Sequence, residues 1–270
     1  MSLVNTNWLE ENLDKVKIID CSWHMPQTKR NGFEEYKNQH IENAIFFDLD
    51  KNSKTYIDLP HMLTDIKSWE DIVSSMGIEN KDKIIIYDNS DVISSCRCWY
   101  NFIYFGHDPS LIHVLDGGLK KWINEKKPMV NNLTKTINSN YIANEKKELV
   151  KDKKQIDENI NINEFKVIDA RSRERFEGKV PEPRKGLRSG SIKNSFCLPF
   201  SELINEDHTF ISKEKILNKF RLIKIKPDEN VVFTCGSGVT ASVLALAYFL
   251  IGIKYMPAIY DGSWSEYGNN

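Results

Sequence analysis

The sequence predicts an α/β protein built from two homologous domains, each with a central parallel sheet flanked by helices. Three observations lead to this prediction: an internal repeat, short β-branched runs, and helical stretches between those runs. The repeat consists of four matches in the same order, at offsets of 145 to 151 residues, which pair Asp20 with Asp169, Ile41 with Ile192, Asp88 with Cys235, and Asp116 with Asp261. We therefore expect an N-terminal domain at 1–128, an Asn- and Lys-rich surface linker at 129–157, and a C-terminal domain at 158–270.

Within each repeat the local pattern alternates between strand and helix. Short continuous apolar runs are typical of parallel strands that are buried on both faces. Such strands are expected at 16–20, 84–87, 167–169 and 231–234. Amphipathic helices are expected at 69–76 and 213–219. The stretch 240–250 is apolar on nearly all sides, so we expect a buried helix that ends before Gly252.

Composition excludes several classes of partner. Lys plus Arg total 37 and Asp plus Glu total 38, so the formal net charge of -1 provides no field for nucleic acid or an anionic membrane. The chain has no run of about 18 apolar residues that could span a bilayer. Its five scattered cysteines and the lack of a basic-then-apolar leader pattern lead us to expect a protein of the reducing cytoplasm.

The strongest chemical signal is Cys235, which follows a buried strand and precedes a glycine-containing loop and an apolar helix. Gly236 and Gly238 allow the backbone to curl so that successive amides converge on one anion. A helix N-terminus at the same place would stabilise a thiolate. An inert, buried cysteine beside a tight turn is the alternative interpretation.

Two familiar chemistries do not fit this loop. A cysteine phosphatase needs an arginine that binds the phosphate, and none occurs at 236–242. A nucleotide-binding P-loop needs a Gly-Lys-Ser/Thr ending, which is also missing. What remains is a nucleophilic thiolate held by backbone donors.

The chain resembles the tandem rhodanese-domain sulfurtransferases over nearly its whole length. The resemblance rests on CGSGVTA at 235–241, PEPRKGLRSGSI at 181–192, HIENAIFFDLD at 40–50, LPHML at 59–63 and YDGSWSEYG at 260–268. The loop is similar to that of 3-mercaptopyruvate sulfurtransferases, because thiosulfate-specific relatives carry basic residues where this chain has Gly236 and Ser237. In that family the first domain lacks the catalytic cysteine, which agrees with Asp88 opposite Cys235.

The resemblance implies a role for each matching residue. Cys235 would form a persulfide, Arg175 and Arg184 would bind the donor's carboxylate, and Ser237, His61 and Asp50 would form a proton relay. The substrate-binding loop would comprise Gly236, Gly238, Val239 and Thr240.

We accordingly expect a monomeric enzyme that moves sulfur from a small-molecule donor, 3-mercaptopyruvate, to cyanide or to a thiol such as thioredoxin or glutathione. No cofactor or metal is expected, because the histidines and cysteines lack metal-ligand spacing. Two alternatives stay open: a thiosulfate:cyanide sulfurtransferase, and a non-catalytic sulfur carrier or redox sensor that uses Cys235. The other four cysteines, Cys21, Cys96, Cys98 and Cys197, are expected to be buried.

Overall fold

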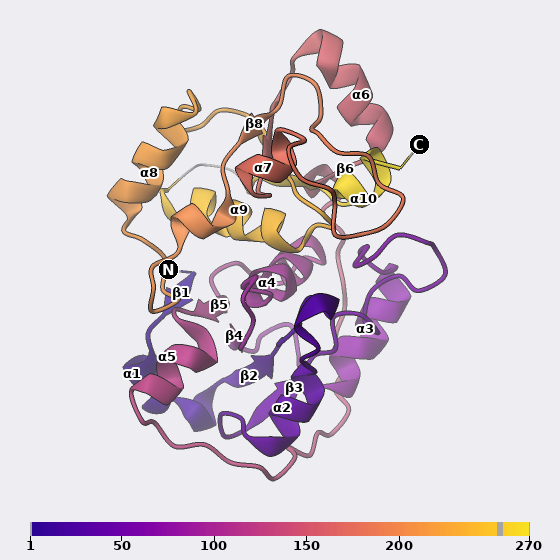
Figure 1. Ribbon diagram of the computed structural model, residues 1–270. Helices are drawn as coiled ribbons and strands as arrows, with labels where there is room; N and C mark the ends of the chain where they lie inside the picture. Colours follow the sequence, from indigo (N-terminus) through magenta and orange to yellow (C-terminus); the bar gives the residue numbers. More distant parts are fainter. Residues whose placement is uncertain (1, 253–255, 270) are drawn as a thin grey trace. The chain divides into compact units, whose positions relative to one another are not determined.

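The computed structural model describes residues 2–252 and 256–269. The chain forms two compact units (Figure 1). The first unit contains the residues up to Lys54, Leu63–Lys146 and Glu206–Thr209, and the second contains Thr55–Met62, Lys147–Asn205 and the residues from Phe210 onward. Each unit has one five-stranded sheet flanked by helices, so the predicted α/β architecture is confirmed.

All strand pairs of the first sheet are parallel, in the order β1-β5-β4-β2-β3. The strand predicted at 84–87 has the expected bounds, and the strand predicted at 16–20 begins one residue later. The strands are β1 (Leu3–Val4), β2 (Lys17–Asp20), β3 (Ala44–Phe46), β4 (Ile84–Tyr87) and β5 (Ile112–Leu115).

Helices connect these strands, as parallel pairing requires. The helix predicted at 69–76 is longer at its start because Asp65 caps it, accepting a hydrogen bond from the amide of Ser68. The helices of the first unit are α1 (Thr6–Glu10), η1 (Leu13–Lys15), η2 (Pro26–Thr28), α2 (Gly32–Asn38), α3 (Ile66–Ser75), α4 (Ser95–Tyr104) and α5 (Gly118–Asn124).

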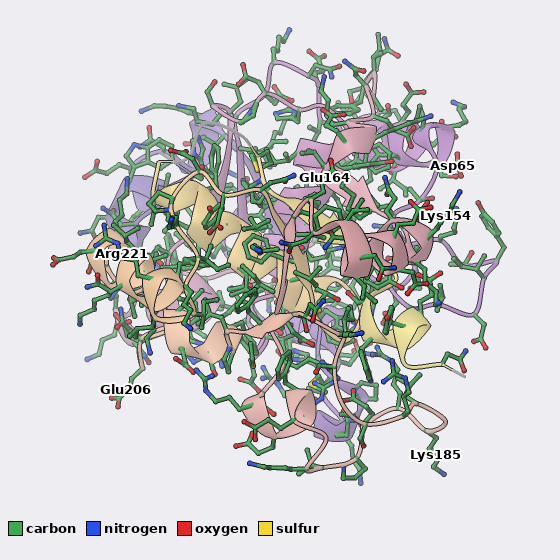
Figure 2. The ribbon with its side chains drawn as sticks, turned by 90° about the horizontal axis from the view of Figure 1, so that it is seen from above. Asp65, Lys154, Glu164, Lys185, Glu206 and Arg221 are labelled. Carbon is green, nitrogen blue, oxygen red and sulfur yellow. The ribbon has the colours of Figure 1, made fainter. Side chains whose placement is uncertain are left out.

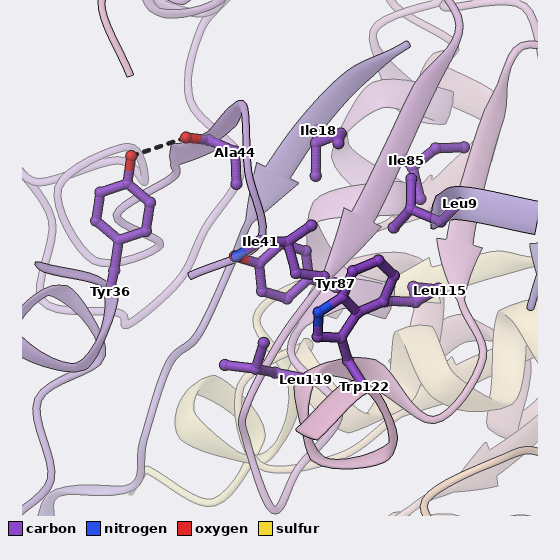
Figure 3. Close-up of a cluster of buried hydrophobic side chains, with 10 residues drawn as sticks. All are labelled: Leu9, Ile18, Tyr36, Ile41, Ala44, Ile85, Tyr87, Leu115, Leu119 and Trp122. Carbon is purple, nitrogen blue, oxygen red and sulfur yellow. Dashed lines mark hydrogen bonds between the residues drawn. The ribbon is translucent and has the colours of Figure 1, made fainter. Parts of the chain in front are cut away.

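The first sheet is buried on both faces because helices cover both. Side chains alternate along each strand, so Ile18 and Ile85 face a cluster that contains Trp122 of α5 (Figure 3). On the other face Trp69 of α3 stacks on Phe105, with ring centroids 4.7 Å apart. This double coverage explains why β4 is apolar without alternation.

The second sheet has the equivalent order, β6-β10-β9-β7-β8, and all its pairs are parallel. The order of the first sheet is therefore repeated strand for strand, as expected from the repeat in the sequence. The strands are β6 (Val150–Lys151), β7 (Lys166–Asp169), β8 (Phe196–Cys197), β9 (Val231–Thr234) and β10 (Ala258–Tyr260).

The helix predicted at 240–250 begins one residue earlier and ends at Leu250, and its side chains are mostly buried, as predicted. On that side of the sheet Phe220, Phe233 and Tyr248 pack with ring centroids 4.9 to 6.1 Å apart. The helices of the second unit are η3 (Lys147–Leu149), α6 (Lys153–Ile162), α7 (Arg173–Phe176), η4 (Phe200–Leu203), α8 (Lys213–Leu222), α9 (Val239–Leu250) and α10 (Ser263–Tyr267).

The segment predicted as a linker contributes to both units. The amides of Asn144 and Lys146 donate to carbonyls of the first unit at 2.9 and 2.8 Å, and Tyr141 is buried there. Val150–Lys151 form the edge strand of the second sheet. A strand of two residues has no periodicity in the sequence, which is why the pattern did not reveal it.

Three of the four remaining cysteines are buried as expected, and the fourth is a correction. Cys197 is only partly buried because β8 is the short edge strand of its sheet.

Charged side chains such as Lys154, Lys185 and Arg221 extend away from the ribbon (Figure 2). In the described part of the chain, no helix is both long enough and apolar enough to cross a bilayer.

Candidate active site around Cys235

Cys235 lies at the carboxyl end of β9, where the chain turns into α9. Gly238 has a φ of +80°, a left-handed conformation that a glycine adopts without strain, and it directly precedes Val239 at the start of the helix. The first amides of an α-helix have no acceptor within the helix, so Val239 and Thr240 present theirs at this end. Cys235 therefore lies in a glycine turn at a helix N-terminus, and the role of this loop in holding an anion stays a prediction.

The start of α10 fixes this loop from the other side. The hydroxyl of Ser263 accepts hydrogen bonds from the amides of Cys235 at 3.2 Å and Gly238 at 3.1 Å, and it donates to the carbonyl of Tyr260. The amide of Trp264 donates to the Cys235 carbonyl at 2.9 Å. Ser263 has a φ of +48°, which is uncommon for a residue with a side chain. The contacts to the loop hold it in this conformation.

His61 and Ser237 meet in the second unit, although 176 residues separate them in the sequence. The His61 Nδ1 atom lies 2.8 Å from the Ser237 Oγ atom, and both residues are buried. Two members of the predicted relay are therefore in hydrogen-bond contact.

The third member, Asp50, belongs to the first unit. The indole Nε1 of Trp23 donates to its carboxylate, at 3.0 Å from each oxygen. The pairing of Asp50 with His61 stays a prediction.

Arg175 and Arg184 both reach the loop next to Cys235. A Cβ atom built on Gly236 would lie 3.4 Å from Arg175 Nη2 and 3.7 Å from Arg184 Nη1. Arg184 also donates to Ser237 Oγ at 3.5 Å, a long hydrogen bond. The two arginines selected from the sequence are thus brought together over the peptide that follows the cysteine.

Two further residues position Arg175, and the sequence analysis did not assign them a role. Glu182, whose side chain is 1% exposed, binds Arg175 at 2.5 Å and Arg171 at 2.8 Å. Arg171 is buried as well, and Asp169 at the end of β7 accepts from it at 2.7 Å. Glu182 lies in the same PEPR motif as Arg184, but no local pattern shows that it faces two arginines.

The equivalent loop of the first unit has an acidic side chain at the position of the cysteine. Asp88, the counterpart of Cys235, accepts hydrogen bonds from the amides of Ser90 at 2.7 Å and Ser95 at 2.9 Å. Leu119 donates to the Asp88 carbonyl at 2.8 Å, just as Trp264 does to Cys235. Burial raises the pKa of the Asp88 carboxyl above its ordinary value. This loop has the same architecture, with a carboxylate in place of the thiol.

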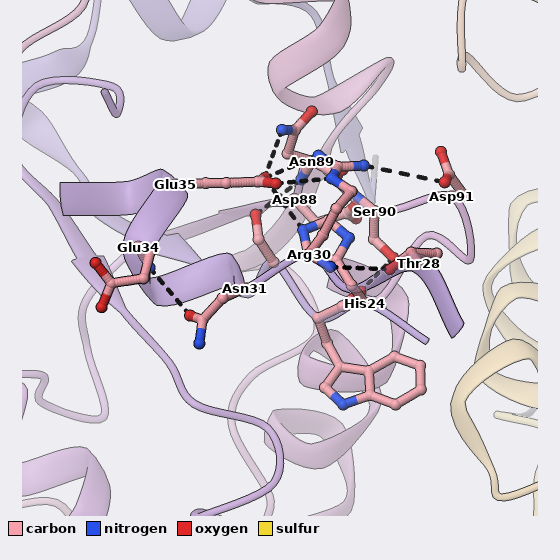
Figure 4. Close-up of polar contacts among 12 residues, drawn as sticks. His24, Thr28, Arg30, Asn31, Glu34, Glu35, Asp88, Asn89, Ser90 and Asp91 are labelled. Carbon is pink, nitrogen blue, oxygen red and sulfur yellow. Dashed lines mark hydrogen bonds and ion pairs between the residues drawn. The ribbon is translucent and has the colours of Figure 1, made fainter. Parts of the chain in front are cut away.

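Ion pairs surround that loop in the first unit (Figure 4). Arg30 donates to both oxygens of Glu35, at 2.7 and 2.8 Å, and Glu35 also accepts from Asn89 and contacts His24. These charged and polar groups are hydrogen-bonded to one another. The loop at 88–94 contains no cysteine. Among the described residues, no three His, Cys, Asp or Glu side chains are grouped as a metal site would require.

Comparisons with known proteins identify the family of the chain. The rhodanese-like domain family matches residues 5–125 and 152–270. Thiosulfate/3-mercaptopyruvate sulfurtransferase 1 of Arabidopsis thaliana is 35% identical, with 98% of this chain and 75% of the relative covered. The 3-mercaptopyruvate sulfurtransferase of Mus musculus and the thiosulfate sulfurtransferase of Rattus norvegicus are each 34% identical, and each alignment covers 98% of this chain and 91% of the relative.

A solved structure is also similar. SseA from Escherichia coli, described as a 3-mercaptopyruvate sulfurtransferase with the rhodanese fold, superposes with a TM-score of 0.88 at 29% sequence identity. The superposition covers 98% of this chain and 99% of that one.

Proposed function

The chain belongs to the rhodanese-like sulfurtransferases with two domains, and from this premise we propose that it transfers sulfur from 3-mercaptopyruvate through a persulfide on Cys235. The observation that carries the proposal is the convergence of Arg175 and Arg184 on the side-chain-free Gly236, next to the cysteine. The relatives are named for 3-mercaptopyruvate, for thiosulfate or for both, so we infer the donor from the site itself.

The two guanidinium groups at the loop favour a donor that carries a carboxylate. 3-Mercaptopyruvate carries a single carboxylate, whereas thiosulfate is a dianion. A planar guanidinium also binds a carboxylate with two parallel hydrogen bonds. Gly236 itself places no side chain between that carboxylate and the two guanidinium groups.

The reaction balances without an external oxidant or reductant. The Cys235 thiolate attacks the sulfur of the donor, and the carbon–sulfur bond breaks as the new sulfur–sulfur bond forms. The bonding electrons leave with the carbon fragment as the enolate of pyruvate, which takes up a proton. An acceptor thiolate then attacks the outer sulfur of the persulfide and regenerates the Cys235 thiolate.

Ser237 and His61 supply the proton path. Arg184 has only donors, so the Ser237 oxygen accepts from it, and Ser237 Oγ shares a second hydrogen bond with His61 Nδ1 whose direction depends on the imidazole tautomer. His61 can then exchange a proton with the leaving enolate through Ser237. Asp50 is proposed to orient the imidazole, as the family resemblance implies.

The decisive experiment combines intact-protein mass spectrometry with a pyruvate assay. The wild-type chain is exposed briefly to 3-mercaptopyruvate or to thiosulfate, and the modified peptide is mapped. We expect one added sulfur at Cys235 and one pyruvate per chain with the first donor, and neither product in Cys235→Ser. Labelling by thiosulfate alone would assign the chain to the sister activity. Labelling by neither donor would favour the carrier or sensor alternative.

A further inference from the structure

Ser265 on α10 contacts both the loop of Cys235 and one of the two arginines. Its amide and its hydroxyl both donate to the carbonyl of Gly236, at 2.9 and 2.6 Å. Arg184 Nη1 donates to the same hydroxyl at 3.4 Å. Ser265 is buried, so its hydroxyl is shielded from solvent.

The direction of each hydrogen bond follows from the chemistry of the partners. A carbonyl oxygen only accepts, so the Ser265 hydroxyl directs its proton to Gly236. Its lone pairs therefore face Arg184, which has only donors. The other amino group of Arg184 has the same relation to Ser237, whose oxygen it reaches at 3.5 Å. Two serine hydroxyls, one on the loop and one on α10, thus fix the plane of the Arg184 guanidinium.

We propose that Ser265 is a positioning residue that aims Arg184 at the carboxylate of the sulfur donor. This role rests on the proposed function, and through Arg184 it would strengthen the binding of the sulfur donor. Both serine contacts are longer than the usual 2.9 to 3.0 Å of such hydrogen bonds. Each terminal nitrogen of Arg184 carries two N–H groups, so a bound carboxylate can accept from both nitrogens while the hydroxyls keep the plane of the guanidinium in place.

Removing only the hydroxyl separates this role from a merely structural one. In Ser265→Ala the amide of residue 265 still donates to Gly236, and Ser263 still holds the amides of Cys235 and Gly238. The loop keeps these supports, and Arg184 loses one acceptor. The substitution is expected to act on donor binding and to leave the attack by Cys235 nearly unchanged.

The test is steady-state kinetics of the full chain with 3-mercaptopyruvate. A hydrogen bond to a charged group contributes about 1.5 kcal/mol at the lower end of its range, so we expect Ser265→Ala to raise KM about tenfold. We expect kcat to change less than about twofold, because the interaction is equal in the bound ground state and the transition state. Ser265→Thr keeps the hydroxyl and should restore most of the affinity.

Two controls make the result specific. Ser195→Ala removes a hydroxyl that donates to the carbonyl of Ile192 at 2.6 Å, away from the loop, and should leave KM unchanged. In an Arg184→Ala background, Ser265→Ala should have no further effect on kcat/KM, since its action passes through the guanidinium. Equal losses in the presence and absence of Arg184, or a fall in kcat with unchanged KM, would overturn the proposal.

A binding measurement keeps this inference separate from the proposed function. Pyruvate carries the same 2-oxo carboxylate and is titrated against each variant by ligand-observed NMR. If pyruvate binds the wild type and binds Ser265→Ala about tenfold more weakly, the role of Ser265 stands, even if no persulfide forms on Cys235. If both bind pyruvate with equal affinity, or if neither binds it, Ser265 does not position Arg184 for a carboxylate.

Discussion

Glu182 offers the sharpest test of how this site is built. Its buried carboxylate lies between two guanidinium groups, at 2.8 Å from Arg171 and 2.5 Å from Arg175. In Glu182→Gln the volume is nearly conserved, but the negative charge is removed and an amide donor faces one of the two cations. Arg171 then keeps Asp169 as its partner, and the Gln oxygen can replace only one of the two carboxylate oxygens that accept from Arg175 Nε and Nη2.

The expected loss of stability follows from burial. Breaking a buried ion pair by removing one partner costs about 3–5 kcal/mol, because the other charge stays uncompensated in the interior. Glu202 provides a matched comparison on the surface. It also bridges two cations, Arg173 at 2.5 Å and Lys219 at 2.7 Å, but its side chain is 26% exposed. Each such exposed pair contributes about 0–1 kcal/mol.

The assay is urea unfolding of Glu182→Gln and Glu202→Gln in the full chain, with hydrogen exchange of peptides from β7 and β9 to locate the loss in the second unit. We expect Glu182→Gln to lower the free energy of unfolding by about 3–5 kcal/mol and Glu202→Gln by less than about 2 kcal/mol. Equal losses in the two variants, or a loss below about 1 kcal/mol for Glu182→Gln, would refute the reasoning from burial.

Three other predictions concern single residues. Burial raises the pKa of Asp20 from 3.8 to about 7, so the native state binds the proton more tightly than the unfolded chain and the free energy of unfolding falls as pH rises through this window. Asp20→Asn should make that slope shallower by up to about 1.4 kcal/mol per pH unit in urea titrations, and an unchanged slope would contradict the shift. Gly236→Ala brings its methyl 3.4 Å from Arg175, an ordinary contact, and should keep most activity, whereas Gly236→Leu should lower kcat/KM about a hundredfold by displacing the guanidiniums. Asn159 bonds both the amide and the carbonyl of Phe165, at 3.0 and 2.8 Å, so Asn159→Ala should cost about 2–3 kcal/mol in thermal unfolding, and a smaller loss would mean that water replaces the side chain.

The two repeats show how one loop architecture diverges. Asp20 and Asp169 end equivalent strands, and each accepts a hydrogen bond from the backbone amide two residues later. In the second repeat that later residue is Arg171, whose guanidinium pairs with the carboxylate, and in the first it is Ser22. The first repeat thus has Asp88 in place of the Cys235 thiol and Ser22 in place of the Arg171 guanidinium.

Local patterns in the sequence were sufficient for the architecture. Continuous apolar runs predicted the bounds of β4 and β9, because strands covered by helices on both faces bury every side chain. Colinear matches between the halves predicted two similar sheets, and the sheets share one strand order. The loop after Cys235 was also evident, since a strand, a glycine turn and an apolar helix are local features.

Only the tertiary structure decided which distant side chains meet at that loop. His61 contacts Ser237 across 176 residues, and Ser265 contacts Gly236 across 29. The burial of Glu182 between two arginines likewise depends on how its loop folds back on the strand ends. No periodicity encodes these contacts, because they arise where irregular segments pack on the edge of a sheet, and each depends on the positions of many residues at once. The sequence by itself determined the fold and the residues that precede and follow Cys235 in the chain. The packing of the loops determined which distant side chains lie at the loop of Cys235.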